Sequence, residues 1–95
     1  MSYSLTSKAQ DDLESIYRYS YENFGECQAE SYYDGLLDCF DLLGENPRLG
    51  REYNAIDQVL RRHEHERHVI YYEIEDRGVL ILRILGANQD PARHL

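Results

Sequence analysis

Two different hydrophobic periods divide the chain into a helical first half and a strand-rich second half. Apolar residues recur every three to four positions over residues 7–24 and again over residues 26–43, which predicts two amphipathic helices. The first helix is expected to begin at Ser7, which opens a Ser-x-x-Gln capping box. Gly25 separates the two helices and Asn46-Pro47 ends the second. Because the connection is so short, we expect an antiparallel helical hairpin.

The second half has the character of a β-hairpin. Residues 67–72 and 79–85 are rich in Val, Ile, Leu and Tyr, and the turn sequence Glu75-Asp76-Arg77-Gly78 joins them. Shorter strands are expected at residues 4–6 and 58–63, with a polar connection over residues 48–57. The predicted order is β-α-α-β-β-β, an α+β fold of two layers in which the helical hairpin packs on an antiparallel sheet. At 95 residues the whole chain, 1–95, is expected to form one domain.

The strands of this hairpin are apolar on both sides. Side chains alternate between the two faces of a strand, and the faces that carry Glu73 and Arg83 are expected to point outward. A sheet that is apolar on both faces is expected to be covered on both. We therefore expect a partner to bind the apolar residues that share the outward face, namely Val69, Tyr71, Val79 and Ile81.

The charge is unevenly distributed along the chain. The net charge is −8, and residues 1–46 hold ten acidic residues against Lys8 and Arg18. Residues 47–95 hold eight acidic residues and eight arginines. This is the reverse of the basic surface that nucleic-acid binding requires, so we expect no direct nucleic-acid partner.

The histidines and cysteines do not form a metal site or a disulfide in the predicted fold. His63, His65 and His68 lie close together, but their spacing does not fit a zinc-binding helix, and no metal or cofactor is expected. Cys27 and Cys39 lie about 18 Å apart along one predicted helix, too far to be bonded. They are therefore expected to be reduced thiols, as in a cytoplasmic protein.

Arg83 interrupts an otherwise apolar strand. A carboxylate or phosphate partner would explain an arginine there. A solvated arginine, or a cross-strand ion pair with Glu73, is the alternative interpretation.

Several motifs, in their order and spacing, resemble the ParE branch of the ParE/RelE toxin superfamily over almost the whole chain. They include the strand hairpin, Leu60-Arg61-Arg62 before it, and Asp90-Pro91-Ala92-Arg93-His94-Leu95 after it. Upstream, the resemblance rests on Leu5-Thr6, Ala9, Asp12-Leu13, Ile16, Tyr19, Phe24-Gly25, Gln28-Ala29 and Asn46-Pro47-Arg48-Leu49-Gly50-Arg51.

The resemblance implies a toxin of a type II toxin–antitoxin module. Such a toxin would inhibit DNA gyrase by binding rather than by catalysis, and a ParD-like antitoxin would neutralise it in a hetero-oligomer. The surface presented to the target is expected to comprise Arg83, Asp90, Arg93 and His94. No membrane-spanning run or export leader is evident, so a cytoplasmic location is expected.

Two alternatives remain open at the level of sequence. A RelE-type mRNA endonuclease acting on the ribosome would need basic residues to bind phosphate, for which Arg61, Arg62 and Arg67 are the candidates. Gly86 stands where many relatives are expected to carry a histidine, so the acid–base half of such a site is weak. The third interpretation is a decayed toxin that only binds its antitoxin.

Overall fold

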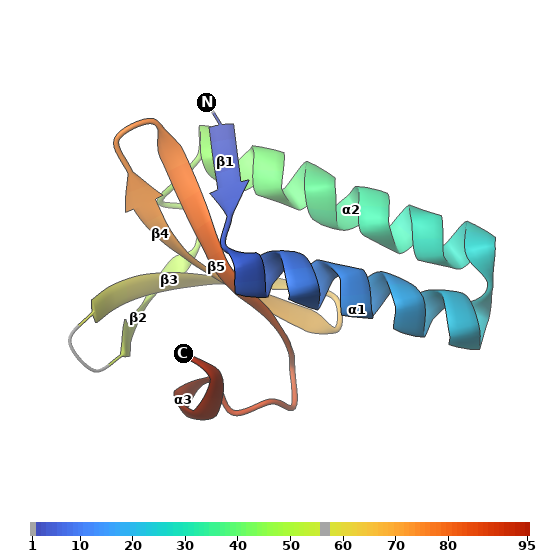
Figure 1. The fold of residues 1–95 in the computed structure, drawn as a ribbon. Helices are drawn as coiled ribbons and strands as arrows, with labels where there is room; N and C mark the ends of the chain where they lie inside the picture. Colours follow the sequence, from blue (N-terminus) through green and yellow to red (C-terminus); the bar gives the residue numbers. More distant parts are fainter. Residues whose placement is uncertain (1, 56–57) are drawn as a thin grey trace.

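A computed structural model describes residues 2–55 and 58–95, and it has two layers, a helical hairpin and a sheet (Figure 1). The helices are α1 (Ser7–Phe24), α2 (Glu26–Glu45) and α3 (Pro91–His94). The strands are β1 (Ser2–Leu5), β2 (Arg51–Ala55), β3 (Gln58–His65), β4 (His68–Glu75) and β5 (Gly78–Gly86). The α+β architecture and the helical hairpin predicted from the sequence are confirmed.

Helices α1 and α2 form the hairpin, and they occupy the predicted ranges to within two residues. The predicted cap is wrong by one position, because the N-cap is Thr6, whose Oγ1 accepts a hydrogen bond from the Ala9 N–H at 3.0 Å. Gly25 ends α1 with φ of 90°, a conformation that favours glycine. None of the helices among the described residues is long and apolar enough to cross a membrane.

The sheet has one more strand than predicted and is mixed rather than wholly antiparallel. Its strand order is β1-β5-β4-β3-β2, and β1 pairs in parallel with β5. Strand β2 lies within the predicted polar connection, of which residues 56–57 fall outside the described part of the chain. As an edge strand, β2 needs no apolar run, which explains why its sequence resembles a loop.

A β-bulge in β5 changes which side chains face the helices. Tyr71 pairs with Arg83 and Tyr72 pairs with Ile81, so Leu82 is an extra residue between these pairs. Before the bulge, Val79 and Ile81 therefore lie in the core beneath the helices, 2% and 0% exposed. Their expected position on the outward face is wrong, and side chains this buried offer almost no surface to a partner.

The face of the sheet opposite the helices has a small core of its own. Val69 and Tyr71 lie there as predicted, and they pack with Leu85. The Tyr53 ring, from β2, meets the Tyr71 ring edge-on at a centroid distance of 5.5 Å. Val69 and Tyr71 are only 4% and 2% exposed, so residues of the same chain already cover the surface that was expected to need a partner.

The two cysteines lie on α2 and are free thiols. Cys27 is exposed near the start of the helix, whereas Cys39 is buried in the main core. Burial raises the pKa of the Cys39 thiol. Both cysteines lie on one continuous helix, which is the geometry from which separate thiols were predicted.

Candidate functional site

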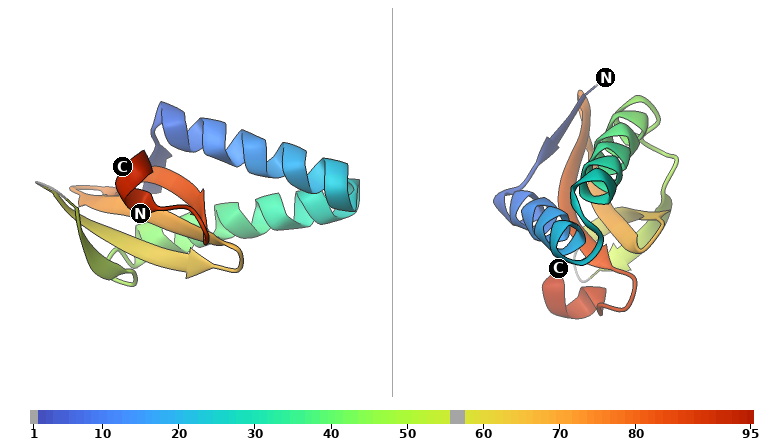
Figure 2. Two further views of the ribbon diagram at one scale, coloured as in Figure 1. Left: turned by 90° about the horizontal axis from the view of Figure 1, so that it is seen from below. Right: turned by 90° about the vertical axis from the view of Figure 1, so that its right-hand side faces the viewer.

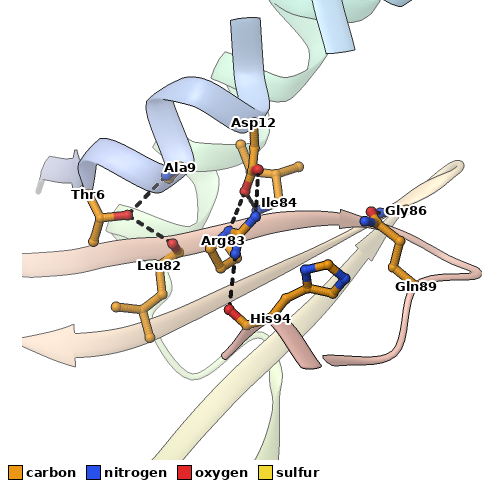
Figure 3. Close-up of polar contacts among 9 residues, drawn as sticks. All are labelled: Thr6, Ala9, Asp12, Leu82, Arg83, Ile84, Gly86, Gln89 and His94. Carbon is orange, nitrogen blue, oxygen red and sulfur yellow. Dashed lines mark hydrogen bonds and ion pairs between the residues drawn. The ribbon is translucent and has the colours of Figure 1, made fainter. Parts of the chain in front are cut away.

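Arg83 forms a bidentate ion pair with Asp12 of α1 (Figure 3). Its Nε donates to Asp12 Oδ2 at 2.7 Å, and its Nη2 donates to Oδ1 at 2.9 Å. The two side chains are 17% and 15% exposed. The Asp12 carboxylate raises the pKa of the Arg83 guanidinium, first through these hydrogen bonds and then through its charge. Arg83 thus has a carboxylate partner, but that partner is on α1 and is not Glu73.

The ion pair lies where the edge of β5 loses its neighbouring strand. Strand β1 ends at Leu5, so the following stretch of β5 is covered by the start of α1 instead. Thr6 Oγ1 donates to the Leu82 carbonyl oxygen at 2.8 Å, and Asp12 Oδ2 accepts the Ile84 N–H at 3.0 Å. A side chain of α1 and the side chain of its N-cap residue thereby satisfy backbone groups at the open strand edge.

Arg83 also fixes the C-terminal tail. Its Nη1 donates to the His94 carbonyl oxygen at 3.0 Å (Figure 3). Asp90 caps α3 by accepting the Ala92 N–H at 3.0 Å, and Gln89 Oε1 accepts the Gly86 N–H at 2.6 Å. The tail borders a cavity of about 290 Å³ lined by Thr6, Lys8, Leu60, Leu82, Arg83, His94 and Leu95.

The predicted target-facing residues therefore have two different environments. Arg83 is largely buried and holds the tail in place, whereas Arg93 on α3 and Asp90 at the N-cap of α3 are exposed. The sequence analysis missed Asp12, because its position off the apolar stripe of α1 predicts a solvated residue. The pair could have been suspected from its opposite charges, because Asp12 lies on the flank of a helix and Arg83 is the single arginine of an apolar strand.

The arginines proposed to bind phosphate do not form one site. Arg61 and Arg62 are adjacent in a strand, so they point to opposite faces of the sheet. Arg61 donates to the Gly50 carbonyl oxygen, and Arg62 lies 3.5 Å from Glu64 and 5.8 Å from the Tyr71 ring centroid. Arg67 lies in the β3–β4 turn with its guanidinium 5.6 Å from the Phe24 ring centroid. The three guanidinium groups thus have separate environments, and phosphate binding by Arg61, Arg62 and Arg67 stays a prediction of the alternative function.

Tyr32, His65 and His68 form a cluster between α2 and the β3–β4 turn. The Tyr32 hydroxyl lies 2.6 Å from His68 Nδ1 and 3.3 Å from the His65 carbonyl oxygen, and its ring packs against both imidazoles. Burial lowers the pKa of His68, and the nearby His65 and Arg67 lower it further. Burial also raises the pKa of Tyr32. The cluster joins α2 to the sheet, and both shifts favour the neutral forms of Tyr32 and His68.

We expect the free energy of unfolding to fall as the pH is lowered from about 7 to about 5.5, because an unfolded His68, with a pKa near 6.5, binds a proton before the folded one does. His68→Asn keeps a polar atom near the Nδ1 position but cannot titrate. In this variant the free energy of unfolding should therefore depend less steeply on pH. Urea unfolding at several pH values measures it. His63→Asn is the comparison, since burial also lowers the pKa of His63. An unchanged slope in His68→Asn would contradict the prediction.

Comparison with known proteins then gives the family. The family model described as "ParE toxin of type II toxin-antitoxin system, parDE" matches residues 3–91. The chain belongs to the ParE toxin family. It is 32% identical over 94 residues to Toxin ParE1 of Mycobacterium tuberculosis (strain CDC 1551 / Oshkosh), covering 98% of this chain and 96% of that protein. Toxin ParE1 of Caulobacter vibrioides is 30% identical over 93 residues, with the same coverage.

The ParE fold is also supported by a solved structure. The chromosomal ParDE TA system from P. aeruginosa contains a chain that is similar to this one with a TM-score of 0.76 and 23% identity, over 90% of this chain and 95% of that one. At that identity the likeness concerns the fold. The family match and the two relatives identify the chain as a ParE toxin of a type II toxin–antitoxin system.

Proposed function

We propose that this ParE toxin acts as a single domain that inhibits DNA gyrase in the cytoplasm by binding it, without catalysis of its own. A cognate ParD-like antitoxin would neutralise it in a hetero-oligomer. The observation that carries the proposal is that the arginines of the sheet already have partners within the chain. Arg83 is paired with Asp12, Arg62 lies beside Glu64, and Arg61 is bonded to a backbone carbonyl.

Such arginines are poorly suited to hold an RNA backbone. Binding phosphate would require each guanidinium to leave a partner that it already has, and the net charge of −8 would oppose a polyanion. A protein target imposes no such requirement, because protein interfaces use local charge complementarity rather than a general excess of positive charge.

The tail is the proposed contact with the target. Asp90 and Arg93 are exposed on α3, and His94 is partly exposed beside them. Arg83 contributes by positioning the tail through the His94 carbonyl, so its role is indirect. Charged groups on a fixed turn are well suited to contact a partner, since the ordering cost is already met in the free toxin.

One observation keeps the RelE-type endonuclease as a second candidate. The Tyr32 hydroxyl lies 2.6 Å from His68 Nδ1, and His68 directly follows Arg67 in the sequence, so two titratable side chains meet beside the turn that carries an arginine. This acid–base pair differs from the one expected of a RelE-type site, in which Gly86 takes the place of a histidine.

Two assays with the purified toxin distinguish these functions. We expect it to block supercoiling of relaxed DNA by gyrase and to leave cell-free translation unaffected, and premixing with the cognate antitoxin should restore supercoiling. If the toxin instead inhibits translation, and the double variant Tyr32→Phe, His68→Asn does not, the protein is an endonuclease. A toxin that affects neither process but binds the antitoxin would indicate the decayed form.

A further inference from the structure

A groove of about 830 Å³ runs between α1 and α2 and reaches the edge strand β1. The two helices meet at Gly25 and separate toward β1, as the ribbon views show (Figures 1 and 2). The residues that line the groove are Tyr3, Leu5, Gln10, Leu13, Glu14, Tyr17, Glu30, Tyr33, Asp34 and Leu37.

The floor of the groove is apolar and aromatic. Leu13 is buried in the main core, and Leu5 and Leu37 are partly buried against it. The Tyr17 and Tyr33 rings, one from each helix, meet edge-on at a centroid distance of 5.7 Å. Because Leu5, Leu37 and the two tyrosines remain partly exposed, a second apolar surface would gain contacts here that the free toxin lacks.

The rim of the groove is acidic. Glu14 lies on the α1 side, Glu30 and Asp34 lie on the α2 side, and none of the described lining residues is basic. The pKa of Glu30 is raised, first because its protonated carboxyl can donate a hydrogen bond to Glu26 and then by the negative charge of Glu26, with a further contribution from Asp34. Arg18 lies 3.7 Å from Glu14 and offsets part of this negative charge, but the ion pair is exposed and contributes little free energy.

This arrangement of charge disfavours the free helix. Glu26, Glu30 and Asp34 follow one another at four-residue steps on α2, and like charges at that spacing repel one another. A cationic partner would relieve the repulsion, whereas nucleic acid, an anionic membrane or the acidic hairpin of a second copy would increase it.

We propose that the groove binds a cationic amphipathic helix, with apolar residues at i, i+3 or i+4, and i+7 on the floor and Lys or Arg residues on both sides facing the acidic rim. This is the helix-in-groove mode of recognition. The inference rests on the proposed function in one respect, since the antitoxin is then the source of the helix. The groove, rather than the face of the sheet opposite the helices, is then the surface open to the antitoxin. That face of the sheet is already covered by Tyr53 and its neighbours.

The first test uses three synthetic peptides of equal length that share their apolar positions. One carries lysines at the flanking positions, one carries glutamates there, and one is a scrambled form of the lysine peptide. The lysine peptide should bind the toxin at least about tenfold more tightly than the other two at low ionic strength, and its affinity should fall as salt is added. Equal binding of the lysine and glutamate peptides would overturn the proposal.

The second test uses a matched pair of toxin variants. The rim variant is Glu14→Gln, Glu30→Gln, Asp34→Asn, and the control is Asp11→Asn, Glu22→Gln, Glu45→Gln, which removes the same charge from exposed positions outside the groove. The rim variant should bind the lysine peptide at least about tenfold more weakly, and the control no more than about threefold. Loss of like-charge pairs should leave the melting temperature of the rim variant unchanged or raised, which excludes misfolding as the cause.

The same variants separate the two proposals. If the antitoxin binds the rim variant as tightly as the parent toxin, the groove is not its site, although the toxin–antitoxin pairing stands. If the antitoxin binds none of the proteins while the lysine peptide does bind, the pairing fails and the groove remains. Weaker antitoxin binding by the rim variant alone supports both.

Discussion

Arg83→Ala is expected to lower the free energy of unfolding by about 2–4 kcal/mol, because it leaves the Asp12 carboxylate largely buried without its ion-pair partner. Asp12 would keep the Ile84 N–H as a donor, which is why the expected loss is below the full cost of an isolated buried charge. Urea unfolding monitored by circular dichroism measures the change. Toxicity should also fall, since the tail loses its hydrogen bond to Arg83.

Two further variants show whether the ion pair is responsible. Arg93→Ala removes an equal charge from an exposed position on α3 and should change stability by no more than about 0.5 kcal/mol. Combining Asp12→Ala with Arg83→Ala should cost less than the sum of the two single changes, because the double variant leaves no unpaired charge. A stable, non-toxic Arg83→Ala protein would show that Arg83 meets the target directly, as the sequence suggested.

The exceptional character of Arg83 could be predicted from the sequence, whereas its partner could not. A charged residue in an apolar strand is a local anomaly that any strand model reveals. Asp12 lies 71 positions upstream, and only the parallel pairing of β1 with β5 brings the start of α1 over the edge of β5. The hydrophobic pattern of α1 contains no information about that contact, because the pairing register is a property of the whole sheet.

The orientation of β5 was mispredicted for a different physical reason. Alternation assigns faces correctly only while a strand is regular, and the extra Leu82 shifts the pattern by one residue. Val79 and Ile81 consequently lie in the core and not on the outward face. Both faces of a strand this apolar look alike in sequence, so no residue marks the bulge. The helical periods were far easier to predict because polar residues mark one side of each helix.

Under the proposed function, removal of residues 90–95 should reduce inhibition of gyrase by at least about tenfold, because it deletes the exposed Asp90 and Arg93 together with His94. Antitoxin binding should change little, since the groove between α1 and α2 contains none of these residues. The fold should survive with a loss of about 1–2 kcal/mol, from one hydrogen bond to Arg83 and some apolar contact with Leu95. Supercoiling assays, calorimetry with the antitoxin and urea unfolding provide the three measurements.

Two double variants show whether the charged side chains of the tail contact the target or whether the tail is needed for another reason. Asp90→Ala with Arg93→Ala leaves the net charge and the chain length unchanged, although it removes the side-chain cap of α3. Asp90→Ser with Arg93→Ala restores a capping side chain, so it tests the charges alone. If both double variants lose inhibition, the charged groups make the contact. If only the uncapped one does, the shape of α3 matters more than its charges, and full activity of the truncated toxin would place the target-binding surface elsewhere on the fold.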